Sequence, residues 1–289
     1  MRLCLSCRQP LHDDGWDCRQ CGHRPPTRDG FVVLAPALAA STEGFDPALF
    51  AELARLEADN FWFRARNRLL LWALARYAPA CRRFLEVGCG TGYVLQGVAQ
   101  RFPDWSLCGT EAHAEALPFA ARRIPAATLL QMDARLSPFE AEFDAAGAFD
   151  VIEHIREDEA VLGELHRSLK ADGLLFLTVP QHPLLWSEYD RRAHHERRYT
   201  AAELRQKLIR AGFEIIRMTS FVSLLLPLML MSRLTHKPRE DYDPLDELRL
   251  HPLPNRVFEW TLDVERLLIR AGLSWPMGGS LLAVARRSR

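Results

Sequence analysis

The glycine-rich segment Glu86-Val-Gly88-Cys-Gly90-Thr-Gly92 constrains the fold more than any other part of the chain. It follows a short apolar run at 84–85 and precedes a helical pattern over 93–102. A strand that passes through such a turn into a helix lets the backbone approach a ligand, and the first helical amides carry partial positive charge. A dinucleotide site would need G-x-G-x-x-G, but Tyr93 occupies the last glycine position. The segment therefore predicts a cofactor site of another kind, with an ordinary strand-to-helix turn as the alternative.

Acidic residues follow the next predicted strands in order. The runs 106–110, 128–132 and 143–149 end in Glu111, Asp133 and Asp150. A helix over 157–170 and a fifth strand over 174–179 come next. An acid at the end of the second strand accepts hydrogen bonds from ribose hydroxyls in doubly wound nucleotide-binding sheets. Each acid alone is typical of a solvated loop, but the ordered series predicts a nucleotide-containing cofactor.

An acid two residues before G-x-G-x-G, followed by this series, resembles motif I of the class I methyltransferases that depend on S-adenosylmethionine (SAM). The resemblance covers residues 80 to about 213 and implies a Rossmann-like, doubly wound α/β sheet of seven strands with the last strand antiparallel. It implies that Glu86, Gly88, Gly90 and Gly92 contact the methionine end of SAM. It also implies that Glu111 contacts the ribose and that Asp133 contacts the adenine.

Two C-x-x-C pairs at the N-terminus predict a structural zinc site. Cys4 and Cys7 are separated by ten residues from Cys18 and Cys21. Four thiolates can hold one Zn²⁺ tetrahedrally, and a metal would supply the folding energy that a segment of about 30 residues cannot obtain from a hydrophobic core. The segment is similar to zinc ribbons that precede some SAM methyltransferases. A redox pair or disulfides are the alternatives, although an odd total of seven cysteines favours reduced thiols.

Composition bounds the partners and the compartment. The 37 basic and 37 acidic residues give a net charge of zero, which argues against a nucleic-acid substrate. No apolar run reaches the length of a bilayer span, and no signal peptide precedes Cys4. We therefore expect a cytoplasmic protein.

The pattern divides the chain into five segments: a zinc ribbon (1–35), a linker with an N-terminal helical region (36–79), the SAM-binding core (80–220), a helical and apolar insertion (221–279) and the last core strand (280–289). Similarity to small-molecule methyltransferases with an aromatic and arginine-rich N-terminal helix implies that Trp62 or Arg66 lines the cofactor cleft, and we predict that Arg66 contacts the cofactor. Thr200 and Glu203 predict the start of a helix that ends at Gly212.

The apolar run at 221–231 is unusual for a loop, and Pro227 interrupts it. Eleven residues cannot span a membrane. The run is typical of a helix that packs over the domain or against a dimer partner. The alternative is an interfacial segment, in peripheral contact with a membrane, or an apolar wall for a lipophilic acceptor.

The segment Asp150-x-x-Glu153-His154 resembles the fourth-strand motif of ubiquinone-pathway O-methyltransferases and of small-RNA 2′-O-methyltransferases. In the RNA family a later His, five residues before a Thr, completes a Mg²⁺ site, and His195 has that spacing to Thr200. We predict Glu153, His154 and His195 as catalytic residues, with His154 as general base, because a neutral imidazole can accept a proton near pH 7. A Mg²⁺ ion held with Asp150 is the alternative mechanism, and a role in capping the following helix is the alternative to both.

Taken together, these features predict a SAM-dependent methyltransferase acting on a small metabolite or a lipid- or sugar-linked acceptor, most simply at oxygen. Two other functions are compatible with the motifs. One is a zinc-ribbon RNA methyltransferase, and the other is a non-catalytic binding protein that retains the SAM-domain architecture.

Overall fold

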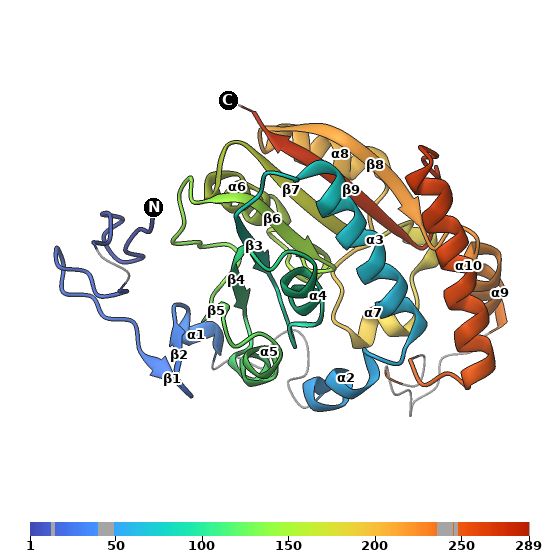
Figure 1. The fold of residues 1–289 in the computed structure, drawn as a ribbon, viewed down its shortest axis with the longest axis horizontal. Helices are drawn as coiled ribbons and strands as arrows, with labels where there is room; N and C mark the ends of the chain where they lie inside the picture. The colour runs from blue at the N-terminus through green and yellow to red at the C-terminus, as the bar shows by residue number, and fades with distance from the viewer. Residues whose placement is uncertain (13–14, 40–48, 236–244, 246–247, 289) are drawn as a thin grey trace.

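The structure is a computed structural model that describes residues 1–12, 15–39, 49–235, 245 and 248–288. A nine-stranded sheet lies between two layers of helices (Figure 1). The strands are β1 (Thr27–Arg28), β2 (Phe31–Val33), β3 (Arg83–Val87), β4 (Ser106–Glu111), β5 (Thr128–Gln131), β6 (Phe143–Phe149), β7 (Leu169–Pro180), β8 (Phe213–Phe221) and β9 (Ser280–Arg287). The helices are α1 (Pro36–Ala39), α2 (Phe50–Leu56), α3 (Phe61–Tyr77), α4 (Tyr93–Arg101), α5 (Leu117–Arg123), α6 (Asp158–Ser168), α7 (Glu188–Arg192), α8 (Ala201–Arg210), α9 (Leu226–Thr235) and α10 (Pro252–Arg270).

The strand order is β1-β2-β5-β4-β3-β6-β7-β9-β8. Strands β5, β4, β3, β6 and β7 run parallel, and β9 lies antiparallel between β7 and β8. From β3 the chain continues to β4 and β5 on one side of β3, and it then crosses to β6 on the other side of β3. Such a switch point opens a crevice at the carboxyl ends of the strands, where ligands of doubly wound sheets bind. The sheet therefore places the glycine-rich turn after β3 in this crevice.

The prediction of seven strands is wrong, because the N-terminal segment adds two more. β2 pairs in parallel with β5, with Val32 opposite Leu130, and β1 pairs antiparallel with β2. Val33 is buried by this pairing. An edge strand leaves a row of backbone donors and acceptors unpaired, and β2 satisfies those of β5.

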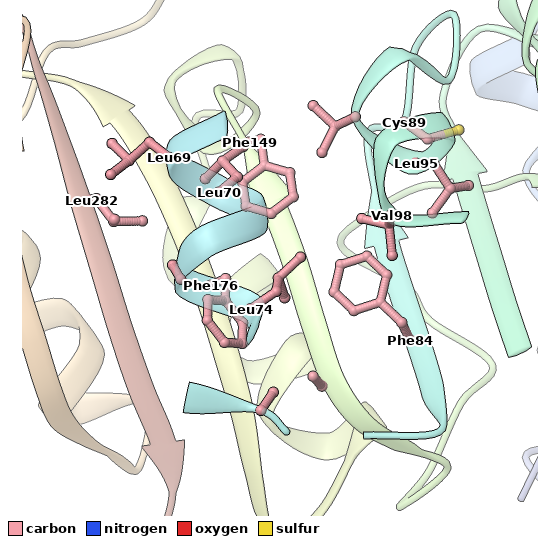
Figure 2. Close-up of a cluster of buried hydrophobic side chains, with 14 of the residues drawn as sticks. Leu69, Leu70, Leu74, Phe84, Cys89, Leu95, Val98, Phe149, Phe176 and Leu282 are labelled. Carbon is pink, nitrogen blue, oxygen red and sulfur yellow. The ribbon is translucent and has the colours of Figure 1, made fainter. Parts of the chain in front are cut away.

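Two hydrophobic clusters hold the helices on the sheet. On one face, α3, α4, α5 and α10 share a core with β3, β6 and β7. Figure 2 shows Leu70 and Leu74 of α3 directed toward Phe149 and Phe176 of the sheet. Helices α6 and α8 cover the other face. Residues four apart lie on one side of a helix, so the apolar spacing of α3 produces this packing.

Most predicted core elements are confirmed. The Thr200 hydroxyl accepts a hydrogen bond from the Glu203 amide at 3.1 Å at the start of α8. Within the predicted linker and N-terminal helical region (36–79), α2 and α3 are separate helices, because Asn60 begins α3 and its side chain accepts from the Trp62 amide at 2.8 Å. The insertion carries helices α9 and α10, and the apolar run at 221–231 begins inside β8. Within the described ranges, no helix combines the length and apolarity that crossing a bilayer requires.

Candidate functional site

A cavity of about 1200 Å³ lies at the carboxyl ends of β3 to β7. Its walls include the predicted cofactor and catalytic residues Arg66, Glu86, Gly88, Gly90, Glu111, Asp133, Asp150, Glu153, His154 and His195. Gly92 is not among them. The structure therefore brings nearly the whole predicted site around one space.

The glycine-rich loop depends on three backbones that only glycine adopts readily. Gly88, Gly90 and Gly92 have φ of 70°, 51° and 79°. A Cβ at Gly88 would lie 2.4 Å from a methyl carbon of Val151, and one at Gly92 would lie 2.9 Å from the backbone of Ala120. Apart from its chain neighbours, a Cβ at Gly90 would meet no atom of the described residues within 4 Å. Gly88 and Gly92 thus allow close packing, whereas Gly90 faces space that a ligand can occupy.

Glu111, the last residue of the neighbouring strand β4, holds this loop in place through hydrogen bonds. One carboxylate oxygen accepts a hydrogen bond from the Gly90 amide at 2.8 Å, and the other accepts from the His113 amide at 3.1 Å. A carboxylate oxygen has two lone pairs, so each retains acceptor capacity for a ribose hydroxyl. The predicted ribose ligand therefore also positions the glycine loop.

A second brace was not predicted from the sequence. Buried Glu57, just after α2, accepts hydrogen bonds from the Thr91 hydroxyl at 2.6 Å and from Arg123 of α5 at 2.6 Å. Arg123 also donates to the Thr91 carbonyl at 3.1 Å. These three residues lie far apart in sequence and share no motif, so only the fold brings them together.

Glu86 is buried at the end of β3 and lines the cavity. One of its carboxylate oxygens is buried and has no hydrogen-bond partner in the described part of the chain, and burial raises the pKa of Glu86 to about 8. A cationic ligand group beside it would favour the ionised form and supply the missing partner. The amino group of a bound methionine moiety has that chemistry, so Glu86 fits the predicted cofactor.

Asp133 is already engaged by its neighbour. Arg135 donates to it through its backbone amide at 2.8 Å and through its guanidinium at 2.8 Å. Partial burial opposes ionisation, but the hydrogen bonds from Arg135 outweigh it and lower the pKa of Asp133. The carboxylate still lines the cavity. Its predicted contact with adenine would have to share acceptor positions with Arg135.

Arg66 projects from α3 into the cavity wall. Its guanidinium lies 3.0 Å from a carboxylate oxygen of Asp150 and 4.6 Å from the ring centroid of Trp62. Both Trp62 and Arg66 line the cavity. Asp150 follows β6 and has a φ of 58°, an unusual conformation for a residue other than glycine. The pair ties the N-terminal helix to the end of β6.

Glu153, His154 and His195 form a second cluster in the same cavity. One ligand atom from each lies within 4.8 Å of the others, and the two imidazole centroids are 4.7 Å apart. Glu153 is fully buried, and neither of its carboxylate oxygens has a hydrogen-bond partner among the residues that the structure describes. Burial raises the pKa of Glu153 well above its usual range and lowers the pKa of His154 to about 3. The His154 imidazole is therefore neutral at physiological pH, as a proton acceptor or metal ligand must be.

His195 is held by a carboxylate that was not predicted. Its Nδ1 lies 2.8 Å from fully buried Asp190, which also accepts from Arg198 at 2.8 Å. Burial opposes ionisation of Asp190, but the His195 and Arg198 contacts lower its pKa to about 2. Because Nδ1 is engaged, Nε2 of His195 is the nitrogen available to a ligand. Carboxylates orient metal-binding and catalytic imidazoles in this way.

Three of the four predicted Mg²⁺ ligands come together, and Asp150 does not join them. Its carboxylate pairs with Arg66 and lies outside the group formed by Glu153, His154 and His195. Two imidazoles and one carboxylate suit transition-metal ions better than Mg²⁺, which prefers oxygen ligands.

The four N-terminal cysteines also come together. Their sulfur atoms lie within 4.8 Å of one another, with Cys4–Cys21 at 3.7 Å and Cys7–Cys18 at 3.6 Å. Four ligands about 2.3 Å from one zinc ion would be separated by about 3.8 Å, whereas a disulfide needs about 2.05 Å. The donor set and its spacing fit zinc.

The two C-x-x-C turns share one backbone pattern. The residue after each second cysteine, Arg8 or Gly22, has a positive φ of 59° or 73°. Its amide donates to the carbonyl of the first cysteine, Cys4 or Cys18, at 2.8 and 2.9 Å. The repeated turn directs two thiols from each loop toward a common point.

Comparison with known proteins finds a family that covers the central part of the chain. The family described as a methyltransferase domain matches residues 54–218, more than half of the 289-residue chain. A Mycobacterium tuberculosis protein named "Probable S-adenosylmethionine-dependent methyltransferase" is 30% identical over 166 residues, which are 55% of this chain and 57% of the relative. The trans-aconitate 2-methyltransferase of Acidovorax ebreus is 30% identical over 138 residues, 47% of this chain and 50% of the relative. The chain thus spans 57% and 50% of the lengths of these two relatives.

Solved structures share the fold. A SAM-dependent methyltransferase from Thermotoga maritima has a TM-score of 0.51 at 17% identity, covering 84% of this chain and 98% of its own. The [4+2]-cyclase SpnF has a TM-score of 0.53 at 23% identity, covering 78% of this chain and 83% of its own. A cyclase with the same architecture illustrates that fold alone does not determine the reaction.

Proposed function

Because this chain belongs to the methyltransferase domain family, we propose that it transfers the methyl group of SAM to an oxygen of a small metabolite or of a lipid- or sugar-linked acceptor. The supporting observation is that the glycine loop and the Glu153–His154–His195 cluster line one cavity. The cofactor would lie along Glu86, Gly90 and Glu111, which offer an unpartnered carboxylate, open space and free lone pairs.

For this reaction the protein has to position the acceptor hydroxyl against the methyl group and to accept one proton. Bound SAM supplies a methyl group on a sulfonium, a centre that is already activated. An acceptor hydroxyl held in line with that methyl group forms the new carbon–oxygen bond as the carbon–sulfur bond breaks. His154 accepts the hydroxyl proton, because its imidazole is neutral and the residue lines the cavity. His195, oriented by Asp190, completes the wall around this proton acceptor.

A divalent ion bound by Glu153, His154 and His195 is the second candidate mechanism. It would lower the pKa of the acceptor hydroxyl in place of general base catalysis. Both mechanisms use Glu153, His154 and His195, so mutation of these residues would impair both. Removal of the metal by a chelator distinguishes the two mechanisms more directly.

The apolar side of the cavity supports a lipophilic acceptor. Leu225, Leu228 and Met229, in or next to α9, line it together with Phe258 of α10. Such walls suit an acceptor with a hydrocarbon portion better than a polyanion. The zero net charge likewise disfavours RNA as the acceptor.

Label transfer tests the proposal. The protein is incubated with methyl-labelled SAM and separate small-molecule, lipid and RNA fractions of a bacterial extract. We expect label in the small-molecule or lipid fraction, and expect S-adenosylhomocysteine to suppress it. Label confined to RNA would favour the RNA methyltransferase, and the absence of both labelling and SAM binding would favour a scaffold protein.

We further propose one structural zinc ion at Cys4, Cys7, Cys18 and Cys21. Freshly purified protein should contain about one zinc per chain by elemental analysis, because four thiolates bind Zn²⁺ tightly. Cys21→Ser should lose most of the metal, whereas Cys81→Ala, which removes a buried cysteine outside the cluster, should keep it. Wild-type protein that lacks zinc and exposes four reactive thiols would contradict the assignment.

A further inference from the structure

Helix α10 exposes an apolar stripe to solvent. Leu253, Val257, Trp260 and Leu267 are 68%, 50%, 70% and 54% exposed. Their spacing of four, three and seven residues places them on one side of a helix. We call these four side chains the outer stripe.

The opposite side of α10 is also apolar. Leu262 and Ile269 are buried in the core, and Phe258 packs against Phe61 of α3 and lines the cavity. The inner side therefore accounts for the attachment of α10 to the domain. The outer stripe lies outside the hydrophobic core that makes this attachment, and exposing it to water is unfavourable.

The charges of α10 are arranged unequally. All three of its carboxylates have partners within the protein: Glu259 pairs with Arg64 and Arg68, Asp263 pairs with Arg68 and Arg266, and buried Glu265 accepts from the amides of Ser223 and Leu224. Arg256 and Arg270 are exposed and make no ion pair with any residue that the structure describes. The solvent side of the helix is thus apolar and positively charged.

A second copy of the chain would match this surface poorly. Two α10 helices could pack antiparallel through their outer stripes, with the crossing point at the level of residue 262 along the helix axis. Trp260 would then lie against Val264 of the other copy. Arg256 and Arg270 lie on the same side of the stripe. In a two-fold symmetric antiparallel pair these sides of the two helices adjoin, so Arg256 of one copy would lie beside Arg270 of the other copy. Like charges in such positions are destabilising. Acidic lipid headgroups instead complement the two arginines, while the acyl boundary accepts leucine, valine and tryptophan.

We propose that the outer stripe of α10, with Arg256 and Arg270, docks the protein on an anionic lipid bilayer surface. Trp260 and Leu267 enter the interface, and the helix lies along it. Phe258 on the same helix walls the cavity. If the proposed acceptor is lipid-linked, docking brings it to the element that lines the site. The docking itself does not depend on methyl transfer.

Vesicle sedimentation tests the proposal with the full chain. Wild-type protein should bind phosphatidylcholine vesicles that contain phosphatidylglycerol at least about tenfold more strongly than pure phosphatidylcholine vesicles, and added salt should weaken the binding. The Trp260→Ser/Leu267→Ser variant should lose about tenfold or more, because its apolar contact is removed. Arg256→Ala/Arg270→Ala should lose the preference for the anionic lipid.

Ile209→Ser is the matched control, because Ile209 is 57% exposed on α8, which covers the other face of the sheet. Its binding should equal that of wild type, and thermal unfolding should show that every variant is folded. Wild-type protein that does not bind anionic vesicles would overturn the proposal, as would unchanged binding of Trp260→Ser/Leu267→Ser. A wild-type dimer that this variant converts to a monomer, without vesicle binding, would assign the stripe to a second copy. SAM binding measured without vesicles separates these outcomes from a failure of the proposed function.

Discussion

His154→Ala should lose at least about 100-fold in turnover while its dissociation constant for SAM stays at the wild-type value, because general base catalysis contributes about 10²- to 10⁴-fold. His154 lines the same cavity as the glycine loop but is not one of the residues proposed to hold SAM. Its imidazole is neutral because burial lowers its pKa to about 3. Alanine therefore removes a proton acceptor without adding or removing a charge.

His166→Ala is the control for this substitution. His166 stacks edge-on against Phe213 at 5.2 Å, outside the cavity walls, so its loss should leave turnover within about twofold. Chelation separates the two roles of His154. Activity that EDTA abolishes and Mn²⁺ or Mg²⁺ restores would make His154 a metal ligand. Full activity of His154→Ala would contradict both mechanisms.

The sequence was sufficient to predict the cofactor half of the fold. Strand, turn and helix around Gly88, Gly90 and Gly92 were recognisable because each glycine serves a local backbone requirement, with φ above 50° at all three positions. The end of each following strand carries an acid, and parallel strands bring those ends to one edge. Local patterns of this kind are complete within about 20 residues, so they can be found without tertiary information.

Other features depend on contacts that no local pattern records. Asp190 positions His195 from the short helix α7 after β7, and its only sequence signal was a nearby Ser187 in a capping arrangement. Asp150 was expected beside Glu153, but Arg66 from a distant helix competes for its carboxylate. β2 joins the sheet because the edge of β5 is available, a fact that the spacing of residues 31–33 cannot reveal.

The apolar run at 221–231 was expected to pack over the domain or against a dimer partner, with an interfacial segment or an apolar wall for a lipophilic acceptor as the alternative. The structure adds a second candidate, because α10 is apolar on two opposite sides. Leu262 faces the core and Trp260 faces solvent. An apolar spacing predicts a helix but not which of two apolar sides is buried, since that choice depends on α3.

Glu111→Ala should weaken SAM binding by about tenfold or more. Two losses contribute: charge-assisted hydrogen bonds to the ribose, worth roughly 1.5–3 kcal/mol, and the hydrogen bond that fixes the Gly90 amide at 2.8 Å. Glu111→Gln should lose less, because an amide oxygen can still accept one hydrogen bond. Asp104→Ala, which removes an exposed acid before β4, should bind SAM as wild type does.

The binding of SAM itself tests the account most directly. Titration calorimetry of wild-type protein with SAM should give one site per chain, and the same titration of Glu111→Ala should give a dissociation constant at least about tenfold higher. Wild-type protein that gives no binding, or a Glu111→Ala variant whose dissociation constant is unchanged, would contradict the assignment of this cavity to the cofactor.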